Sequence, residues 1–173
     1  MDANEIKALQ APLKQKYRDD PQSAVVRLRA QARLGEGITC NVETGKALVQ
    51  AGLHPATGGD GLSACSGDML LEALAACAGV TLRAVATATS IPLRDATITA
   101  EGDLDFRGTL AVAKDTPVGV QRIRLKFDLE SDATREQLET LIHLTERYCV
   151  VYQTLSKPSE ISVTYESHPV KGS

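Results

Sequence analysis

The chain has 173 residues, which suits one domain of ordinary size with at most an appendage. Its net charge is −3 and it has no Trp, two Phe and four Tyr, so neither charge nor aromatic stacking favours nucleic-acid binding. The first residues contain no apolar run fit for a signal peptide, and charges interrupt every long apolar stretch. We therefore expect a soluble, cytoplasmic protein that binds neither nucleic acid nor membrane.

In chain order, residues 1–22 are predicted to form a helical appendage, and residues 23–167 the main domain, followed by a tail at 168–173. Within the appendage, apolar residues three and four apart predict a helix over 3–18, with Asp2 as its N-cap and Glu5 three residues further on.

The main domain begins with strands. Alternation of apolar and polar residues predicts strands at 24–34 and 38–43, joined as a hairpin, and a short third strand at 47–51. A loop rich in Gly and Ser occupies 52–67. The most apolar helix of the chain follows at 68–88, and Pro92 ends it.

The second half repeats this order of strands followed by a helix. Strands are predicted at 96–106 and 121–130, then one long helix from Ser131 or Asp132, the alternative N-caps, to about Leu155, and a last strand at 159–167. Runs of strands separated by two long helices indicate the α+β class.

The four cysteines are the residues with chemical potential: Cys40, Cys65, Cys77 and Cys149. In the cytoplasm they are expected to be reduced. No two form a C-x-x-C motif and the chain has only three His, so we expect no metal site and no cofactor. Cys40 points inward on its strand and is expected in the core, whereas Cys65 lies in the loop as a potential third redox thiol.

Cys77 lies on the apolar arc of the helix at 68–88, facing packed protein. It is either a buried structural thiol or a reactive thiol in a dry pocket. A reactive thiol needs a cation nearby, and Arg83 cannot supply it because it shares the opposite face with Glu72.

Cys149 lies near the end of the second long helix, where Glu146 on the same face would raise the pKa of its thiol. This placement suits a partner thiol that attacks an oxidised sulfur. Two of the histidines are given no catalytic role: His54 is expected to be structural or exposed, and His143 to lie at an interface.

The stretch "DMLLEALAACAGVTLRAVA" at 68–86 resembles the first-cysteine helix of the OsmC/Ohr family, the osmotically induced and organic-hydroperoxide-resistance proteins. "GLHPATGGDG" is similar to the loop before that helix, and the second half of the chain places Cys149 where the family has its second cysteine. The resemblance spans about residues 24–165. It implies an intertwined homodimer with two long central helices wrapped by antiparallel sheet.

The resemblance also implies a thiol-dependent peroxidase that reduces small organic hydroperoxides. The residue matching Cys77 attacks the peroxide and becomes a sulfenic acid, the residue matching Cys149 condenses with it to a disulfide, and an external dithiol restores both thiols. An arginine from the first strands stabilises the thiolate, and Arg33 is our choice, followed by Arg27 and Arg29.

Two positions depart from the family pattern. Gly67 stands where the hydroperoxide-resistance branch has a glutamate, and Val150 stands where proline usually follows the second cysteine. These departures indicate the broader OsmC-like branch. They leave open an alternative function, in which a non-catalytic dimer binds a small hydrophobic ligand.

Overall fold

The structure, a computed structural model, describes residues 49–111, 114–157 and 159–168, the backbone alone being described at Leu48 and Arg107. Earlier in the chain it describes 2–5, 8, 11, 15 and 19, and the backbone of 31–34 and 39–43. The described positions from 3 to 19 are helical. The predicted cap is confirmed: the Asp2 carboxylate accepts from the backbone N–H of Asn4 and Glu5, at 2.7 and 2.8 Å.

The first sheet contains the three predicted strands and a fourth that the sequence did not reveal. Its strands are β1 (Gln31–Leu34), β2 (Thr39–Glu43), β3 (Leu48–Gly52) and β4 (Ala64–Cys65), in that order across the sheet. The first three are antiparallel neighbours, whereas the two-residue β4 pairs with β3 in parallel. Between β3 and β4 lies the short 3-10 helix η2 (Pro55–Thr57).

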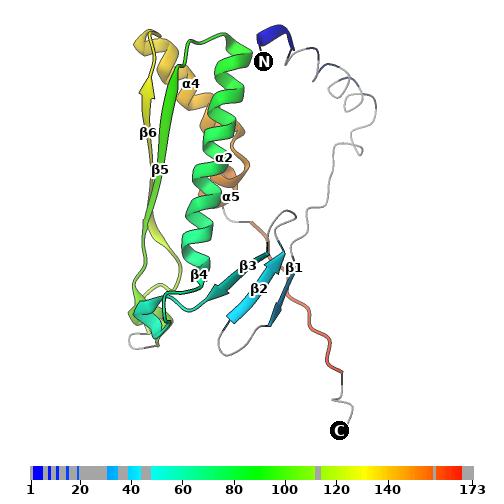
Figure 1. Cartoon of the computed structure of the whole chain (residues 1–173), viewed down its shortest axis with the longest axis vertical. Helices are drawn as coiled ribbons and strands as arrows, with labels where there is room; N and C mark the ends of the chain where they lie inside the picture. Colours follow the sequence, from blue (N-terminus) through cyan, green and yellow to red (C-terminus); the bar gives the residue numbers. More distant parts are fainter. Residues whose placement is uncertain are drawn as a thin grey trace.

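Helix α2 (Ser66–Thr89) is the central element, and it runs the length of the second sheet (Figure 1). By length and composition it could span a membrane. Leu74, Ala78, Leu82 and Ala86 form a buried stripe along it, and the last two belong to the hydrophobic core. Ser90 ends the helix in the left-handed conformation (φ 57°), two residues before Pro92.

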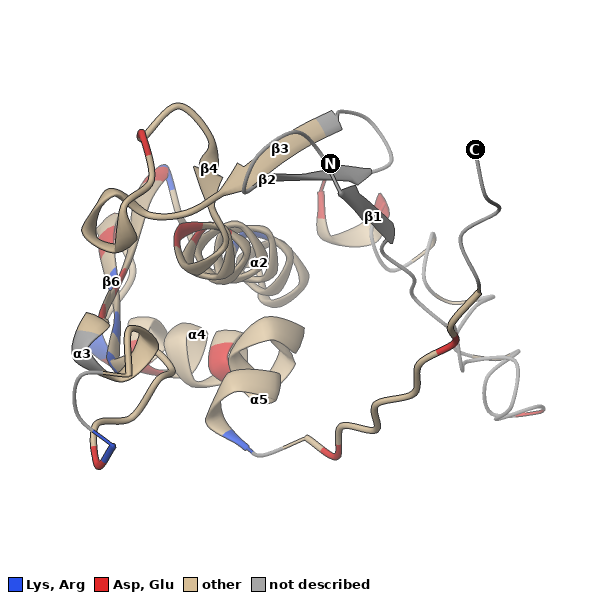
Figure 2. Ribbon diagram, turned by 90° about the horizontal axis from the view of Figure 1, so that it is seen from below, with Lys and Arg blue, Asp and Glu red and all other residues tan. Residues whose placement is uncertain are grey.

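The second sheet is the antiparallel hairpin of β5 (Asp95–Asp103) and β6 (Gln121–Glu130), whose inward residues cover one side of α2 (Figure 2). The bounds of β6 agree with the prediction, but β5 ends three residues earlier than predicted, because the short helix α3 (Phe106–Thr109) follows. At Gly102, beside a register shift, a Cβ would lie 2.4 Å from Val120 Cγ1, so this crossing of the two chain segments requires glycine.

The second long helix is broken, which corrects the prediction of one continuous helix. It consists of α4 (Arg135–Tyr148) and α5 (Val150–Ser156), with Cys149 between them in an extended conformation (φ −72°, ψ 109°). Its N-cap is Thr134, in a capping box with Gln137, rather than either predicted residue. Both α4 and α5 pack against α2.

The predicted strand at 159–167 is not formed. Residues 159–168 have neither helix nor strand structure, and they lead away from the packed elements (Figure 1). Ile161, Val163 and Tyr165 are 84%, 89% and 91% exposed. The alternation that predicted a strand is present, but a strand needs a partner for its backbone hydrogen bonds, and no described strand pairs with this segment.

Candidate functional site: two thiols at a helix break

The site is where α2 meets the junction of α4 and α5. Cys77 is at the middle of α2, half-buried, and the thiol of Cys149 is one of the neighbouring groups that shift its pKa. Cys149 is 1% exposed. The structure therefore brings together the two thiols that the sequence singles out, although Cys77 is less buried than its helical pattern predicts.

The break in the second helix exposes two backbone amides at this place. In a continuous helix the N–H of Val150 would donate to the carbonyl of Glu146, and that of Val151 to the carbonyl of Arg147. The extended conformation of Cys149 interrupts this ladder, so both amides are available to the thiols, and each of them acts to lower the pKa of Cys77. The hydroxyl of Thr81, one turn along α2, acts in the same direction.

These contacts decide how the Cys77 thiol ionises. Burial is the largest single influence and opposes ionisation, which would raise its pKa. The hydrogen bonds from the Val151 amide, the Cys149 thiol, the Val150 amide and the Thr81 hydroxyl outweigh it and lower the pKa of Cys77 below its usual value. The thiolate is thus stabilised by uncharged donors, whereas the sequence argument required a cation.

The pKa of Cys149 moves in the opposite direction. Burial raises it first, and the neighbouring Cys77 raises it further, because a thiol that donates a hydrogen bond to a thiolate resists losing its proton. The predicted direction is confirmed, but the physical cause is burial rather than the predicted Glu146. The two neighbouring thiols therefore have opposite pKa shifts, with Cys77 the easier of the two to ionise.

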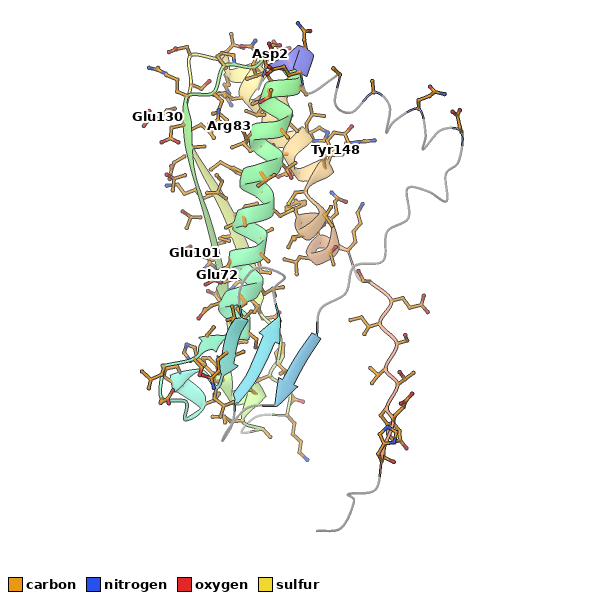
Figure 3. All side chains as sticks on the ribbon, turned by 45° about the vertical axis from the view of Figure 1, so that its right-hand side comes forward. Asp2, Glu72, Arg83, Glu101, Glu130 and Tyr148 are labelled. Carbon is orange, nitrogen blue, oxygen red and sulfur yellow. The ribbon has the colours of Figure 1, made fainter. Side chains whose placement is uncertain are left out.

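The cations expected near the site are placed as follows. Arg83 (labelled in Figure 3) donates to the carbonyls of Leu93 and Arg94, at 2.6 and 3.2 Å. Its guanidinium therefore holds the loop after α2, which agrees with the prediction that Arg83 is not the cation beside Cys77. Arg33 lies on β1 opposite Asn41, but its side chain is outside the described residues, as are Arg27 and Arg29.

The remaining predicted residues lie elsewhere. His54 has a structural role, since its Nδ1 accepts from the N–H of Ala56 at 3.0 Å and its ring stacks on Phe106 at 4.8 Å. Cys65 is half-buried at the start of α2, and His143 is exposed on α4. The side chain of Cys40 is outside the described residues. No group of three metal-ligating side chains occurs in the part of the chain that the structure describes.

A cavity of about 520 Å³ opens between β6 and the α4–α5 junction. Leu74, one turn of α2 before Cys77, is part of its wall. Half of the other lining side chains are apolar and half are polar: Val120, Ile123, Leu125, Phe127 and Leu155, then Gln121, Arg122, Glu146, Tyr152 and Ser156.

Sequence reasoning missed the donors to Cys77 other than Cys149. Thr81 could have been found, because it is four residues from Cys77 on a predicted helix. The two amides could not, because the prediction of a continuous helix gave each of them a carbonyl partner. The available signal was the run Tyr148 to Tyr152, "YCVVY", whose β-branched and aromatic residues are weak helix formers.

The sequence and the fold are similar to those of known proteins. Residues 58–164 match the family model described as OsmC-like protein. The solved structure of an OsmC-like protein from Mycoplasma pneumoniae is similar with a TM-score of 0.65 at 18% identity, covering 77% of this chain and 89% of that one. An organic hydroperoxide resistance protein OsmC from Legionella pneumophila has a TM-score of 0.56 at 18% identity, covering 76% and 90%.

A third solved structure, the organic hydroperoxide resistance protein OhrB of Bacillus subtilis, has a TM-score of 0.51 at 18% identity, covering 77% of this chain and 93% of that one. The sequence matches no curated protein. At 18% identity the solved structures show similarity of fold alone. The family model covers more than half of the chain. From the family match over 58–164 and the shared α+β fold, the chain belongs to the OsmC/Ohr family.

Proposed function

We propose that this protein is a thiol-dependent peroxidase that reduces small organic hydroperoxides through Cys77 and Cys149. The observation that carries the proposal is that α2 packs against the break at Cys149 and brings Cys77 and Cys149 together, with the pKa of Cys77 lowered and that of Cys149 raised. Perturbed titratable groups in direct contact are typical of reactive sites. The relatives described as organic hydroperoxide resistance proteins support the same substrate class.

The reaction proceeds in three balanced steps. The Cys77 thiolate attacks the terminal peroxide oxygen, so that an S–O bond forms, the O–O bond breaks, and the alkoxide leaves and takes a proton to give the alcohol. Cys149 then attacks the sulfenic acid at Cys77; the S–S bond forms and water leaves with the Cys149 proton. An external dithiol reduces the disulfide by exchange and is itself oxidised.

The active form is proposed to be a homodimer of two intertwined chains. The α2 face that carries Ala73, Ala76 and Val80 is exposed, Val80 to 73%. The unpaired segment 159–168 exposes three further large apolar side chains. Exposed apolar surface of this extent in one chain favours burial against a second copy, for which twofold symmetry is the default.

Such a dimer would also cover Cys77, whose half-exposed side lies on the same helix. A covered thiol favours organic hydroperoxides over hydrogen peroxide, because the organic tail gains by leaving water. Three of the four cysteines are described, and all three are free, which suits a reducing, cytoplasmic compartment.

A second candidate function is the binding of a small hydrophobic ligand without catalysis. The cavity of about 520 Å³ beside β6 supports it, since its size is that of a small-molecule site and its wall combines apolar side chains with polar ones. In this case the thiols would be structural and would have no need of opposite pKa shifts, which is why the peroxidase is the function we propose.

One titration separates the two functions. The reduced protein is mixed with a substoichiometric amount of cumene hydroperoxide, and the free thiols that remain are counted and mapped by peptide mass spectrometry. The peroxidase loses two thiols for each peroxide, and they are recovered as a disulfide between Cys77 and Cys149. A ligand-binding protein loses thiols slowly and without preference for these two positions.

A further inference from the structure

The break between α4 and α5 leaves one backbone carbonyl, that of Glu146, in need of a hydrogen-bond donor. Because Cys149 is extended, the Val150 N–H does not continue the ladder of α4, and the carbonyl of Glu146 loses the partner that a continuous helix provides. An unpaired carbonyl in a part-buried position destabilises the folded protein, and this cost favours a continuous helix, in which the carbonyl regains its donor. Restoring that helix would withdraw the amide from Cys77.

The structure supplies a substitute donor. The side-chain amide of Gln153 donates from Nε2 to the carbonyl of Glu146 at 2.8 Å. The backbone N–H of the same residue donates to the carbonyl of Cys149 at 2.9 Å, and the N–H of Cys149 donates to the carbonyl of Thr145 at 2.9 Å. Gln153 therefore bonds to the chain on both sides of the break, and α4 and α5 keep their own hydrogen bonds.

We propose that Gln153 is a positioning residue that stabilises the break at Cys149, so that the amides of Val150 and Val151 remain directed at Cys77. This role rests on the proposed function of Cys77 as the attacking thiol. Gln153 acts by replacing Val150 as the donor to the Glu146 carbonyl, which leaves the Val150 amide available.

The chemistry of the side chain fits this role. The position requires a hydrogen-bond donor on a side chain long enough to reach back seven residues from α5 to the last turn of α4. A methionine has similar length but no donor, and an alanine has neither reach nor donor. The departure from the family pattern at Val150 explains the need for it: valine carries an N–H that proline lacks, and does not itself force a break.

The test is the pH dependence of iodoacetamide alkylation at Cys77, followed by peptide mass spectrometry on the reduced, full-length protein. The variants are Gln153→Met and Gln153→Ala. The matched controls are Gln137→Met and Gln137→Ala, because Gln137 also makes a side-chain hydrogen bond to the backbone at an end of α4, its Oε1 accepting from the Thr134 N–H at 2.9 Å.

We expect both Gln153 variants to raise the midpoint of Cys77 alkylation by roughly half a pH unit or more, which is about a threefold slower reaction at neutral pH. The Gln137 variants should lose thermal stability but keep the wild-type midpoint. Midpoints that are unchanged in the Gln153 variants, or that move equally in both pairs, would overturn the proposal. The alanine variants decide the matter if a methionine variant fails to fold.

The measurement is independent of peroxidase activity, since no peroxide is present. A raised midpoint in the Gln153 variants of a protein that fails to consume hydroperoxide would refute the proposed function and retain the role of Gln153. An unchanged midpoint in the Gln153 variants of a protein with full peroxidase activity would refute the role of Gln153 and retain the proposed function.

Discussion

Substituting Val150 by proline tests whether backbone amides activate Cys77. Val150 is the first residue of α5, where proline is favoured in helices, and Cys149 before it has the extended conformation that a following proline requires. The side chain of Val150 is 66% exposed, so little packing is lost. The variant therefore keeps the break and removes one N–H donor from the Cys77 sulfur.

The size of the effect follows from the hydrogen bond that is lost. A hydrogen bond to a charged group contributes roughly 1.5–3 kcal/mol, and the half-exposed Cys77 recovers part of that from water. A net loss near 1.4 kcal/mol corresponds to a midpoint about one pH unit higher, and to alkylation about tenfold slower at neutral pH. The Val151 amide, the Cys149 thiol and Thr81 remain to limit the change.

The assay is alkylation of Cys77 across pH, with Val150→Ala as the control, since alanine removes the side chain and keeps the N–H. We expect the alanine variant to match the wild type and the proline variant to show the higher midpoint. Equal midpoints in the two folded variants would refute the argument that the Val150 amide stabilises the thiolate.

The other predictions concern the two thiols, the arginine and the dimer. Cys149→Ser should accumulate a dimedone-reactive sulfenic acid at Cys77 after one equivalent of hydroperoxide. Cys77→Ser should show no turnover, and dimedone labelling of Cys149 in that variant would mean that Cys149 is the attacking thiol. If Arg33 supplies a cation, Arg33→Ala should raise the midpoint of Cys77 alkylation, and an unchanged profile would exclude it. Sedimentation at micromolar concentration should show a dimer that the double substitution Ile161→Asp, Val163→Asp weakens or dissociates; a stable wild-type monomer would contradict the dimer.

The strands of this fold could be predicted from sequence because alternation of apolar residues has a direct physical cause. The inward residues Ile123, Leu125 and Phe127 define β6, and the observed strand has the predicted bounds. The two-residue β4 could not be found in this way, because its pairing with β3 is set by how the loop returns and its length is too short to show a period.

The thiol pair could be located by sequence, but its activation could not. Placing Cys77 and Cys149 on facing helices needed only their positions in a recognised pattern. Identifying the donors needed the break at Cys149, which depends on a balance between weak helix formers at 148–152 and the contacts that α4 and α5 make with α2. A search for a cation near Cys77 passed over backbone amides, which no side-chain pattern displays.

The terminal segment shows a different limit. The pattern at 159–167 is that of a strand, with Ile161, Val163 and Tyr165 on one side, and yet these residues remain exposed in one chain. Periodicity describes which side of a strand is to be buried, but says nothing about which chain supplies the partner. A strand that is predicted clearly and left unpaired is thus itself an argument for an intermolecular partner.

The two departures from the family pattern, Gly67 and Val150, concern two different ways of stabilising a thiolate at Cys77. Gly67 removes the glutamate expected to pair with an activating arginine, while Val150 in place of proline adds an N–H donor beside Cys77. In the proposed peroxidase, the first change would weaken activation of Cys77 by charge, and the second would strengthen its activation by hydrogen bonds. The two contributions are separable, because Arg33→Ala would remove only the first and Val150→Pro only the second. If the two contributions act independently on the thiolate, the shift of the Cys77 alkylation midpoint in the double variant should equal the sum of the shifts in the two single variants.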